Sequence, residues 1–382
     1  MYWFISKNWC GLVIALGVGL LGLLVDVSAT AMAVGWLAAM MEILGLVLKV
    51  FAAILLALSL LHLLMLAYAK RRFPPPGELV DVGGYRMHIL AEGEGEIPVV
   101  WIPGSHDQGM AFHHLHKVIK QETRSILYDR AGSGWSDVGP FPRRVCLEVD
   151  ELYRLLEASG ETGPFVLVAH SLGGFAAKSF AATYPEKVAG LVLLDSACAD
   201  ASVYASRLKE NKVPGISFAI WAATAFGLAW FIVARMKKQG AEWLSVYDEE
   251  SIKDQVLLGN CQPKLTVGFA GALKAVFDFP FDLVKVPDAL GDMPVFAMIP
   301  PAPKAEQLEE LRQFLPHWSQ GELDNFLDLR IDSQHQNASL SSRGELHYAP
   351  TGATHNFPFE MPEVVFEEVR NMLSLVASEA SG

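Results

Sequence analysis

The chain has 382 residues, and its hydrophobic fraction of 52% is high for a soluble globular protein. Its formal net charge of −12 repels phosphate backbones, so the composition argues against nucleic acid as a partner. Four cysteines are scattered along the chain without a CxxC pair, which predicts neither a disulfide framework nor a metal site. They are Cys10, Cys146, Cys198 and Cys261.

The first 72 residues have the composition of a membrane anchor. The stretch 10–69 carries only three charged residues: Asp26, Glu42 and Lys49. A helix needs about 20 apolar residues to cross the hydrocarbon core of a bilayer. We therefore predict two transmembrane helices, over about 10–30 and 43–68.

The first of these segments has an alternative interpretation as a cleaved signal peptide. Lys7 precedes its apolar core, and residues 29–31 resemble a cleavage site. The second segment is too long for a signal core and ends in the basic residues 70–72, which favour the cytoplasmic side. In either case we expect the following domain to be cytoplasmic, with the basic residues 70–72 facing an anionic bilayer surface.

After a stiff linker over 74–77, short apolar runs alternate with helical stretches. This alternation predicts an α/β fold with a mostly parallel sheet covered by helices on both faces. The expected strands are 85–90, 98–102, 125–128, 165–169, 188–194, 294–299 and 345–348. The expected helices include 143–158, 172–183 and 362–376.

The alternation stops between 201 and 292, which we interpret as a helical lid inserted between two parts of the core, 73–200 and 293–382. Within it, Ile216 to Ala234 is nearly long and apolar enough to span a membrane. As a span, it would place the last two strands across the bilayer from the rest of their sheet. We therefore expect a buried or interfacial helix of the lid there.

The sequence Ala169-His170-Ser171-Leu172-Gly173 matches the G-x-S-x-G nucleophile elbow, with alanine at the first glycine position. A predicted strand enters this motif and a predicted helix leaves it, as the elbow requires. Such a turn would lift the Ser171 hydroxyl to the N-terminus of a helix, where N–H groups face developing negative charge. The alternative is a serine that only caps the helix.

Three ordered motifs resemble the α/β-hydrolase superfamily, in the branch of bacterial lipases and esterases. They are YDRAGSGWSD (128–137), GPFVLVAHSLGGFAAKSFAATYPEKVAGLVLLDSA (163–197) and THNFPFEMPEVV (354–365). The resemblance covers about 83–377 apart from the lid. It implies the α/β-hydrolase fold and a nucleophile, acid and histidine in that chain order.

His355 follows the last expected strand, where the resemblance places the catalytic histidine, whereas His347 lies within that strand and is expected to be structural. The strand 294–299 runs into prolines without the usual aspartate. Asp195 instead ends the preceding strand, at the same sheet edge, and is our candidate for the acid. The alternatives are that Asp195 only caps a loop, or that the acid is one of three other residues: Asp332, Asp200 and Glu306.

The oxyanion hole is assigned through the resemblance as well. Where the family has His-Gly after the strand before the first sheet helix, this chain has Pro103-Gly104, so the donors carried over are the N–H groups of Ser105 and Leu172. His170 and Trp135 are expected as packing or pocket-wall residues that could contact substrate. Asp129 and Arg130 are expected to brace their loop by hydrogen bonds.

Together these features predict a membrane-anchored serine hydrolase that cleaves a carboxylic ester by a Ser171–His355–Asp195 triad, without metal or organic cofactor. A small-molecule ester of lipid-like character is favoured because the anchor would hold the domain at the bilayer. An amide or thioester substrate, acyl transfer on the same triad, and a non-catalytic membrane scaffold or receptor are the alternatives.

Overall fold

The computed structural model describes residues 2–30, 35–104, 107–196, 214–239, 249–276, 288–301, 307–309, 311–312 and 318–380. The chain divides into two compact units, which are described separately. A helical unit comprises 1–74, 214–245 and 253–267. A sheet unit comprises 75–213, 246–252 and 268–382.

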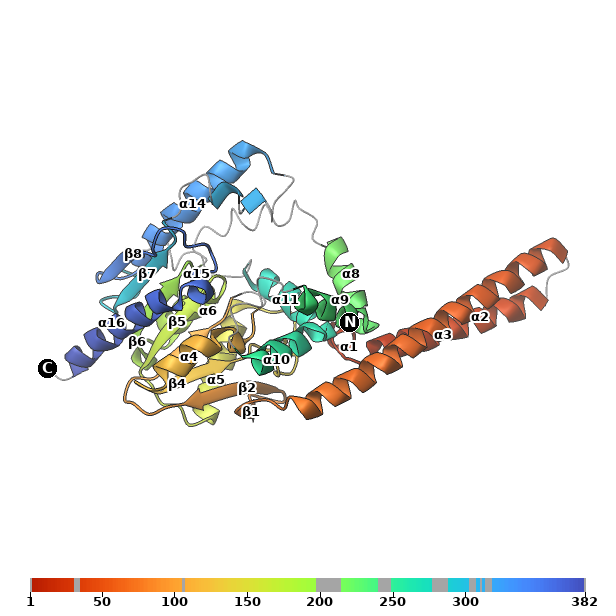
Figure 1. The fold of residues 1–382 in the computed structure, drawn as a ribbon, viewed down its shortest axis with the longest axis horizontal. Helices are drawn as coiled ribbons and strands as arrows, with labels where there is room; N and C mark the ends of the chain where they lie inside the picture. The colour runs from red at the N-terminus through yellow and green to blue at the C-terminus, as the bar shows by residue number, and fades with distance from the viewer. Residues whose placement is uncertain are drawn as a thin grey trace. The chain divides into compact units, whose positions relative to one another are not determined.

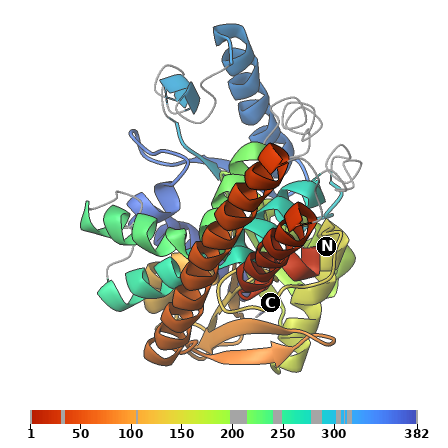
Figure 2. The same ribbon diagram turned by 90° about the vertical axis from the view of Figure 1, so that its right-hand side faces the viewer.

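The helical unit begins with a short helix α1 (Tyr2–Ile5) and two long helices, α2 (Cys10–Thr30) and α3 (Gly35–Arg72). Both α2 and α3 are long and apolar enough to cross a membrane, and they lie side by side (Figures 1 and 2). The first has the predicted bounds. The second is longer than the predicted 43–68 at both ends, because leucine, methionine, alanine and lysine all favour a continuous helix there.

Small residues bring α2 and α3 into close contact. A Cβ atom added at Gly22 would lie 3.2 Å from the Gly45 carbonyl oxygen, and one added at Gly45 would lie 3.1 Å from that of Gly22. Close backbone approach of this kind is typical of helix packing in membranes. Asp26 and Lys49 form an ion pair across the same interface, which fixes the register of the two helices.

The predicted single helix over 216–234 is wrong, because the segment forms two helices that meet at 98°. They are α8 (Pro214–Ala225) and α9 (Leu228–Lys238). Gly227 between them has φ +74°, a left-handed conformation that glycine adopts at little cost. The indole N–H of Trp221 donates to the Ile5 carbonyl at 2.8 Å, so α8 packs against the N-terminal helices of its own unit.

The predicted lid over 201–292 is described only in part, since 201–213, 240–248 and 277–287 lie outside the described residues. Its described part contains α8, α9, α10 (Glu250–Asn260) and α11 (Pro263–Val276). Of these, α8 and α9 belong to the helical unit, while α10 and α11 are divided between the units. The lid itself stays a prediction.

The sheet unit has, within the described residues, an eight-stranded sheet in the order β1-β2-β4-β3-β5-β6-β7-β8. The strands are β1 (Glu78–Asp81), β2 (Arg86–Glu92), β3 (Val99–Ile102), β4 (Ser125–Tyr128), β5 (Phe165–His170), β6 (Val188–Leu194), β7 (Val295–Ile299) and β8 (Gly344–Tyr348). The β1–β2 and β2–β4 pairs are antiparallel, and the remaining neighbours are parallel. The predicted α/β-hydrolase fold class is therefore confirmed. Only β1 was not predicted, because its four residues form a half-exposed edge strand without an apolar run.

Helices cover both faces of the sheet, as the fully buried strands β3, β4 and β5 require. One face packs its core on α5 (Val145–Ala158) and α6 (Gly173–Thr183). The other face is covered by α4 (His113–Ile119) and α16 (Pro362–Ala380) (Figure 1). A further helix, α14 (Gln320–Ala338), packs beside β7 and β8. The short helical turns are η1 (Gly109–Phe112), η2 (Pro185–Lys187) and α15 (Phe357–Glu360).

Candidate active site

The turn between β5 and α6 holds Ser171 in a strained conformation. Its φ is +51°, a value that non-glycine residues rarely adopt. Its N–H donates to the Leu194 carbonyl at 3.3 Å, which ties the turn to β6. The helix-cap interpretation is wrong, because the N-cap of α6 is Leu172 and no side chain caps this helix.

The glycine at the end of the elbow motif is required by close backbone contact. A Cβ atom at Gly173 would lie 2.6 Å from the carbonyl oxygens of both Ile102 and Pro103, at the end of β3. The need for a small residue here follows from the sequence motif, and the structure identifies the neighbouring backbone. The first glycine position, Ala169, is fully buried in β5.

The structure brings Ser171, His355 and Asp195 together at the carboxyl edge of the sheet. Nε2 of His355 lies 3.1 Å from the Ser171 hydroxyl oxygen, and Nδ1 of the same ring lies 2.6 Å from Oδ2 of Asp195. The histidine side chain is 34% exposed, whereas the aspartate side chain is 1% exposed. The arrangement leaves a solvent-accessible imidazole between a hydroxyl and a buried carboxylate.

Asp195 directly follows β6, with φ +39° and its N–H donating to the Met298 carbonyl at 2.7 Å. This bond ties the residue to β7 at the sheet edge, where its Oδ2 contacts the His355 ring. Of the alternative acids, Asp332 is exposed on α14, and Asp200 and Glu306 lie outside the described residues.

Arg330 of α14 is a site residue that the sequence analysis missed. Its Nε donates to Oδ1 of Asp195 at 3.2 Å, and its Nη2 pairs with Oδ2. Its side chain is 13% exposed, so this is a largely buried two-point ion pair. Although burial opposes ionisation of Asp195, the charges of Arg330 and His355 hold its pKa well below the usual range.

Two further polar residues of α14, one and two turns beyond Arg330, contact the loop that begins at Asp195, after β6. Gln334 and Asn337 donate to the Ser196 carbonyl at 2.8 and 3.2 Å. Lys178 of α6 in turn donates to the Asn337 side-chain oxygen at 2.7 Å. The spacing i, i+4, i+7 places all three α14 side chains on one helix face, so that this face fixes the loop carrying Asp195.

The ring of His170 packs against that of His355, with the two centroids 4.7 Å apart, and His170 is 2% exposed. Burial, followed by the nearby charge of His355, lowers the pKa of His170 to about 4, so the ring is neutral at pH 7. Its Nε2 lies 2.9 Å from the His355 carbonyl oxygen, which a neutral Nε2–H can reach as a donor. These contacts agree with the packing role expected for His170, and its contact with substrate stays a prediction.

Of the two expected oxyanion donors, Leu172 is described and Ser105 lies outside the described residues. Within the described part of the chain, the Leu172 N–H has no hydrogen-bond acceptor. The loop before Ser105 passes close to the elbow, since a Cβ atom at Gly104 would lie 3.4 Å from Cβ of Ser171. Arg130, 7% exposed, donates a hydrogen bond to the Gly104 carbonyl and so supports this loop.

The expected bracing of the loop 129–137 is confirmed for Asp129, whereas the Arg130 side chain bonds the loop at Gly104 instead. Asp129 is fully buried and accepts hydrogen bonds from the N–H groups of Gly109 at 2.8 Å and Trp135 at 2.9 Å. Burial opposes its ionisation, but His88 at 2.9 Å and these N–H groups lower its pKa. The ring of Trp135 packs on that of His88, with the two ring centroids 4.9 Å apart. A pocket-wall role for Trp135 stays a prediction.

A mostly parallel sheet with a strained serine at the strand-to-helix turn, next to a histidine and a carboxylate, defines a hydrolase of the α/β type. Residues 99–368 match the family model described as the alpha/beta hydrolase family, and the chain belongs to this family. Among the described residues, no group of three or more metal-binding side chains is placed to hold a metal ion.

The chain is similar to a thermophilic esterase from Thermogutta terrifontis, with 21% identity and a TM-score of 0.53, over 78% of this chain and 97% of the esterase. It is also similar to the lipase LipV of Mycobacterium tuberculosis, with 35% identity over 125 residues. This match covers 32% of this chain and 46% of the lipase. It is 30% identical over 116 residues to a cis-3-alkyl-4-alkyloxetan-2-one decarboxylase of Shewanella oneidensis, 30% of this chain and 36% of that enzyme. The chain thus spans less than half the length of these curated relatives.

Proposed function

We propose that the protein is a membrane-anchored serine hydrolase that cleaves a carboxylic ester of lipid-like character. The observation that carries this proposal is the placement of His355 between Ser171 and Asp195, with atoms 3.1 and 2.6 Å apart. A hydroxyl becomes a nucleophile when a base takes its proton, and these distances are within reach for that transfer.

In the proposed mechanism, the Ser171 hydroxyl oxygen attacks the ester carbonyl carbon while its proton passes to Nε2 of His355. Asp195 holds the Nδ1–H and stabilises the imidazolium that forms. The Leu172 N–H, without an acceptor in the described chain, and the Ser105 N–H donate to the oxyanion.

The tetrahedral intermediate then collapses, and the bond from the carbonyl carbon to the alcohol oxygen breaks. Nε2 returns its proton to the leaving alcohol, which leaves an acyl group on Ser171. Water enters, loses a proton to Nε2 and attacks the acyl carbon. The carboxylic acid leaves as Oγ of Ser171 takes the proton back, so that each turnover consumes one water.

Arg330 is proposed as a positioning residue, because it contacts Asp195 and not the reacting atoms. Its two-point contact fixes the carboxylate plane against the imidazole of His355. Its positive charge also keeps the buried Asp195 ionised, so that the carboxylate can stabilise the imidazolium that forms.

Two features support a membrane location and a lipid-like substrate. Helices α2 and α3 are long and apolar enough to anchor the protein in a bilayer. The basic residues that end α3 favour the cytoplasmic side for the sheet unit. An anchor holds the site next to membrane esters, and the likeness to a lipase agrees with this substrate class.

The proposal is tested with p-nitrophenyl esters of increasing acyl length and the full chain in detergent. We expect hydrolysis that improves with acyl length and falls to background in Ser171→Ala. Ser378→Ala, at an exposed position of α16, is the matched control and keeps full activity, because within the described residues its hydroxyl bonds only to the Leu375 carbonyl of the same helix. Equal hydrolysis by the wild type and Ser171→Ala would reject the nucleophile. Ester alcoholysis that outpaces hydrolysis when alcohol is added would indicate acyl transfer.

A further inference from the structure

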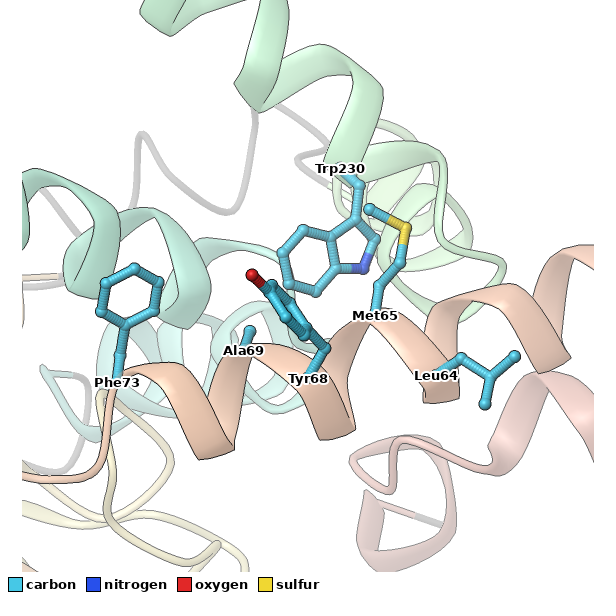
Figure 3. A pocket seen from close by; sticks show the side chains of 6 residues that line it. All are labelled: Leu64, Met65, Tyr68, Ala69, Phe73 and Trp230. Atoms are coloured by element: carbon cyan, nitrogen blue, oxygen red, sulfur yellow. The ribbon is translucent and has the colours of Figure 1, made fainter.

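A groove of about 410 Å³ opens beside the C-terminal end of α3 (Figure 3). The side chains that line it come from α3, from the residue after it and from α9: Leu64, Met65, Tyr68, Ala69, Phe73 and Trp230. Its volume lies in the range of about 300–1,000 Å³ that small-molecule sites occupy. All of these residues belong to the helical unit, so the groove is separate from the residues of the proposed active site.

The groove is formed by fixed side chains. The indole N–H of Trp230 donates to Nδ1 of the buried His62 at 3.0 Å, which holds the indole against α3. A Cβ atom at Gly227 would lie 2.8 Å from that of His62, so glycine allows α9 to begin in contact with α3. Ala69 packs with Leu66 and Leu258 in a small core, and the lining residues Phe73 and Trp230 pack against it. The site therefore exists before a ligand enters, which lowers the entropy cost of binding.

The lining of the groove suits an alkyl chain. The lining side chains carry two polar groups, the Tyr68 hydroxyl and the Trp230 N–H. The Trp230 N–H already donates its hydrogen bond to His62. Leu64 and Tyr68 are 70% and 71% exposed and form the open side, on the surface of α3 that would face lipid. An apolar groove open to the bilayer favours a hydrocarbon chain over a water-soluble ligand.

Positive charge lies directly at one end of the groove. Lys70, Arg71 and Arg72 form the last turn of α3, and the Arg72 guanidinium lies 5.2 Å above the ring centroid of the lining residue Phe73. Arg71 and Arg72 are exposed. Guanidinium groups bind phosphate with two parallel hydrogen bonds, so this end favours the phosphate of an amphiphile.

We propose that the groove binds one acyl chain of an anionic phospholipid, whose phosphate lies against Arg71 and Arg72. This inference rests on the proposed placement of α2 and α3 in a bilayer, and it goes beyond ester cleavage because the lipid is a bound ligand and not a substrate. The lipid would hold α9 against α3 from the bilayer side.

The test uses the full-length Ser171→Ala protein in phosphatidylcholine nanodiscs, since loss of the proposed nucleophile prevents turnover of the probe. A trace of phosphatidylglycerol carries a diazirine on its acyl chain, and cross-linked peptides are mapped by mass spectrometry. We expect cross-links on residues 64–73 and on Trp230, with a higher yield than for a phosphatidylcholine probe with the same chain. Arg71→Gln and Arg72→Gln each lower that preference about fivefold, and lysine at either position retains most of it.

A matched pair of variants tests the groove itself. Leu64→Trp places an indole across its open side, whereas Ile54→Trp places the same ring at an exposed position of α3 outside the groove. The cross-link is lost in the first variant and kept in the second. Equal yields for the two headgroups, equal yields for the two variants, or cross-links spread along α2 and α3 would overturn the proposal. None of these outcomes depends on whether the protein hydrolyses esters.

Discussion

Arg330 and Asp195 form a two-point ion pair across the edge of the sheet, with Nε to Oδ1 at 3.2 Å and Nη2 on Oδ2. The same Oδ2 lies 2.6 Å from Nδ1 of His355. The carboxylate of Asp195 thus has two cationic partners whenever His355 is protonated. Arg330 is therefore linked to His355 through one shared carboxylate.

Arg330→Gln removes the two-point contact that fixes the Asp195 carboxylate against the imidazole of His355. We expect a lower kcat with p-nitrophenyl esters at an unchanged KM, because Arg330 orients the carboxylate and does not contact the substrate. Arg330→Lys keeps the positive charge without the planar two-point geometry and restores part of the lost kcat. An unchanged kcat in Arg330→Gln would contradict the positioning role.

The same variant also tests the contribution of Arg330 to stability. Breaking a largely buried ion pair leaves a charge partly uncompensated, which costs roughly 3 kcal/mol. We expect a lower melting temperature for Arg330→Gln in a thermal scan at pH 7. Arg312→Gln, on an exposed side chain, is the matched control and melts like the wild type.

Asp195→Asn tests the assignment of the acid. An amide cannot hold the Nδ1–H of His355 in the required tautomer, and a loss of about 10⁴-fold in kcat is expected for this change in a serine hydrolase. Asp332→Asn, on the exposed face of α14, leaves kcat unchanged under the same ester assay. Full activity of Asp195→Asn together with loss in Asp332→Asn would transfer the role to Asp332.

His170 makes stability depend on pH. Its pKa is about 4 in the folded protein, whereas an unfolded histidine titrates near 6.5. Between these values the unfolded chain binds the additional proton, so stability is fully present above about pH 6.5 and falls as the pH drops toward 4, by about 3 kcal/mol. His170→Gln removes this contribution. We therefore expect the melting temperature of the wild type to fall more steeply between pH 6.5 and 4 than that of the variant, and parallel curves would contradict the assignment.

Gly173→Ala tests the close contact beneath the elbow. The added methyl group meets the carbonyl oxygens of Ile102 and Pro103 at 2.6 Å, and such overpacking costs about 1–3 kcal/mol. Gly321→Ala is the matched control, because a Cβ atom there meets nothing within 4 Å. Thermal unfolding and ester hydrolysis are measured for both. An unchanged melting temperature and an unchanged rate of hydrolysis in Gly173→Ala would mean that the end of β3 shifts to accommodate the methyl group, which would contradict the close contact.

The sequence predicted the central strands because their residues are apolar on both faces, and it predicted the elbow because serine and glycine occupy fixed positions between a strand and a helix. Asp195 could be proposed because parallel strands end at one edge of a sheet, and His355 because the family resemblance places the catalytic histidine after the last strand. Arg330 could not be found in this way, since it lies mid-helix and only the packing of α14 shows which face meets Asp195. The break at Gly227 was missed because one glycine inside an apolar run gives a weak signal.

His355 is proposed to activate Ser171 as a nucleophile, and mapping a fluorophosphonate adduct measures this activation at the residue itself. The detergent-solubilised full chain is labelled, digested and analysed by mass spectrometry. We expect an adduct on Ser171 whose rate of formation collapses in His355→Gln, because the hydroxyl then lacks the base that takes its proton. An adduct on another residue, or labelling of Ser171 at the same rate in His355→Gln, would contradict it.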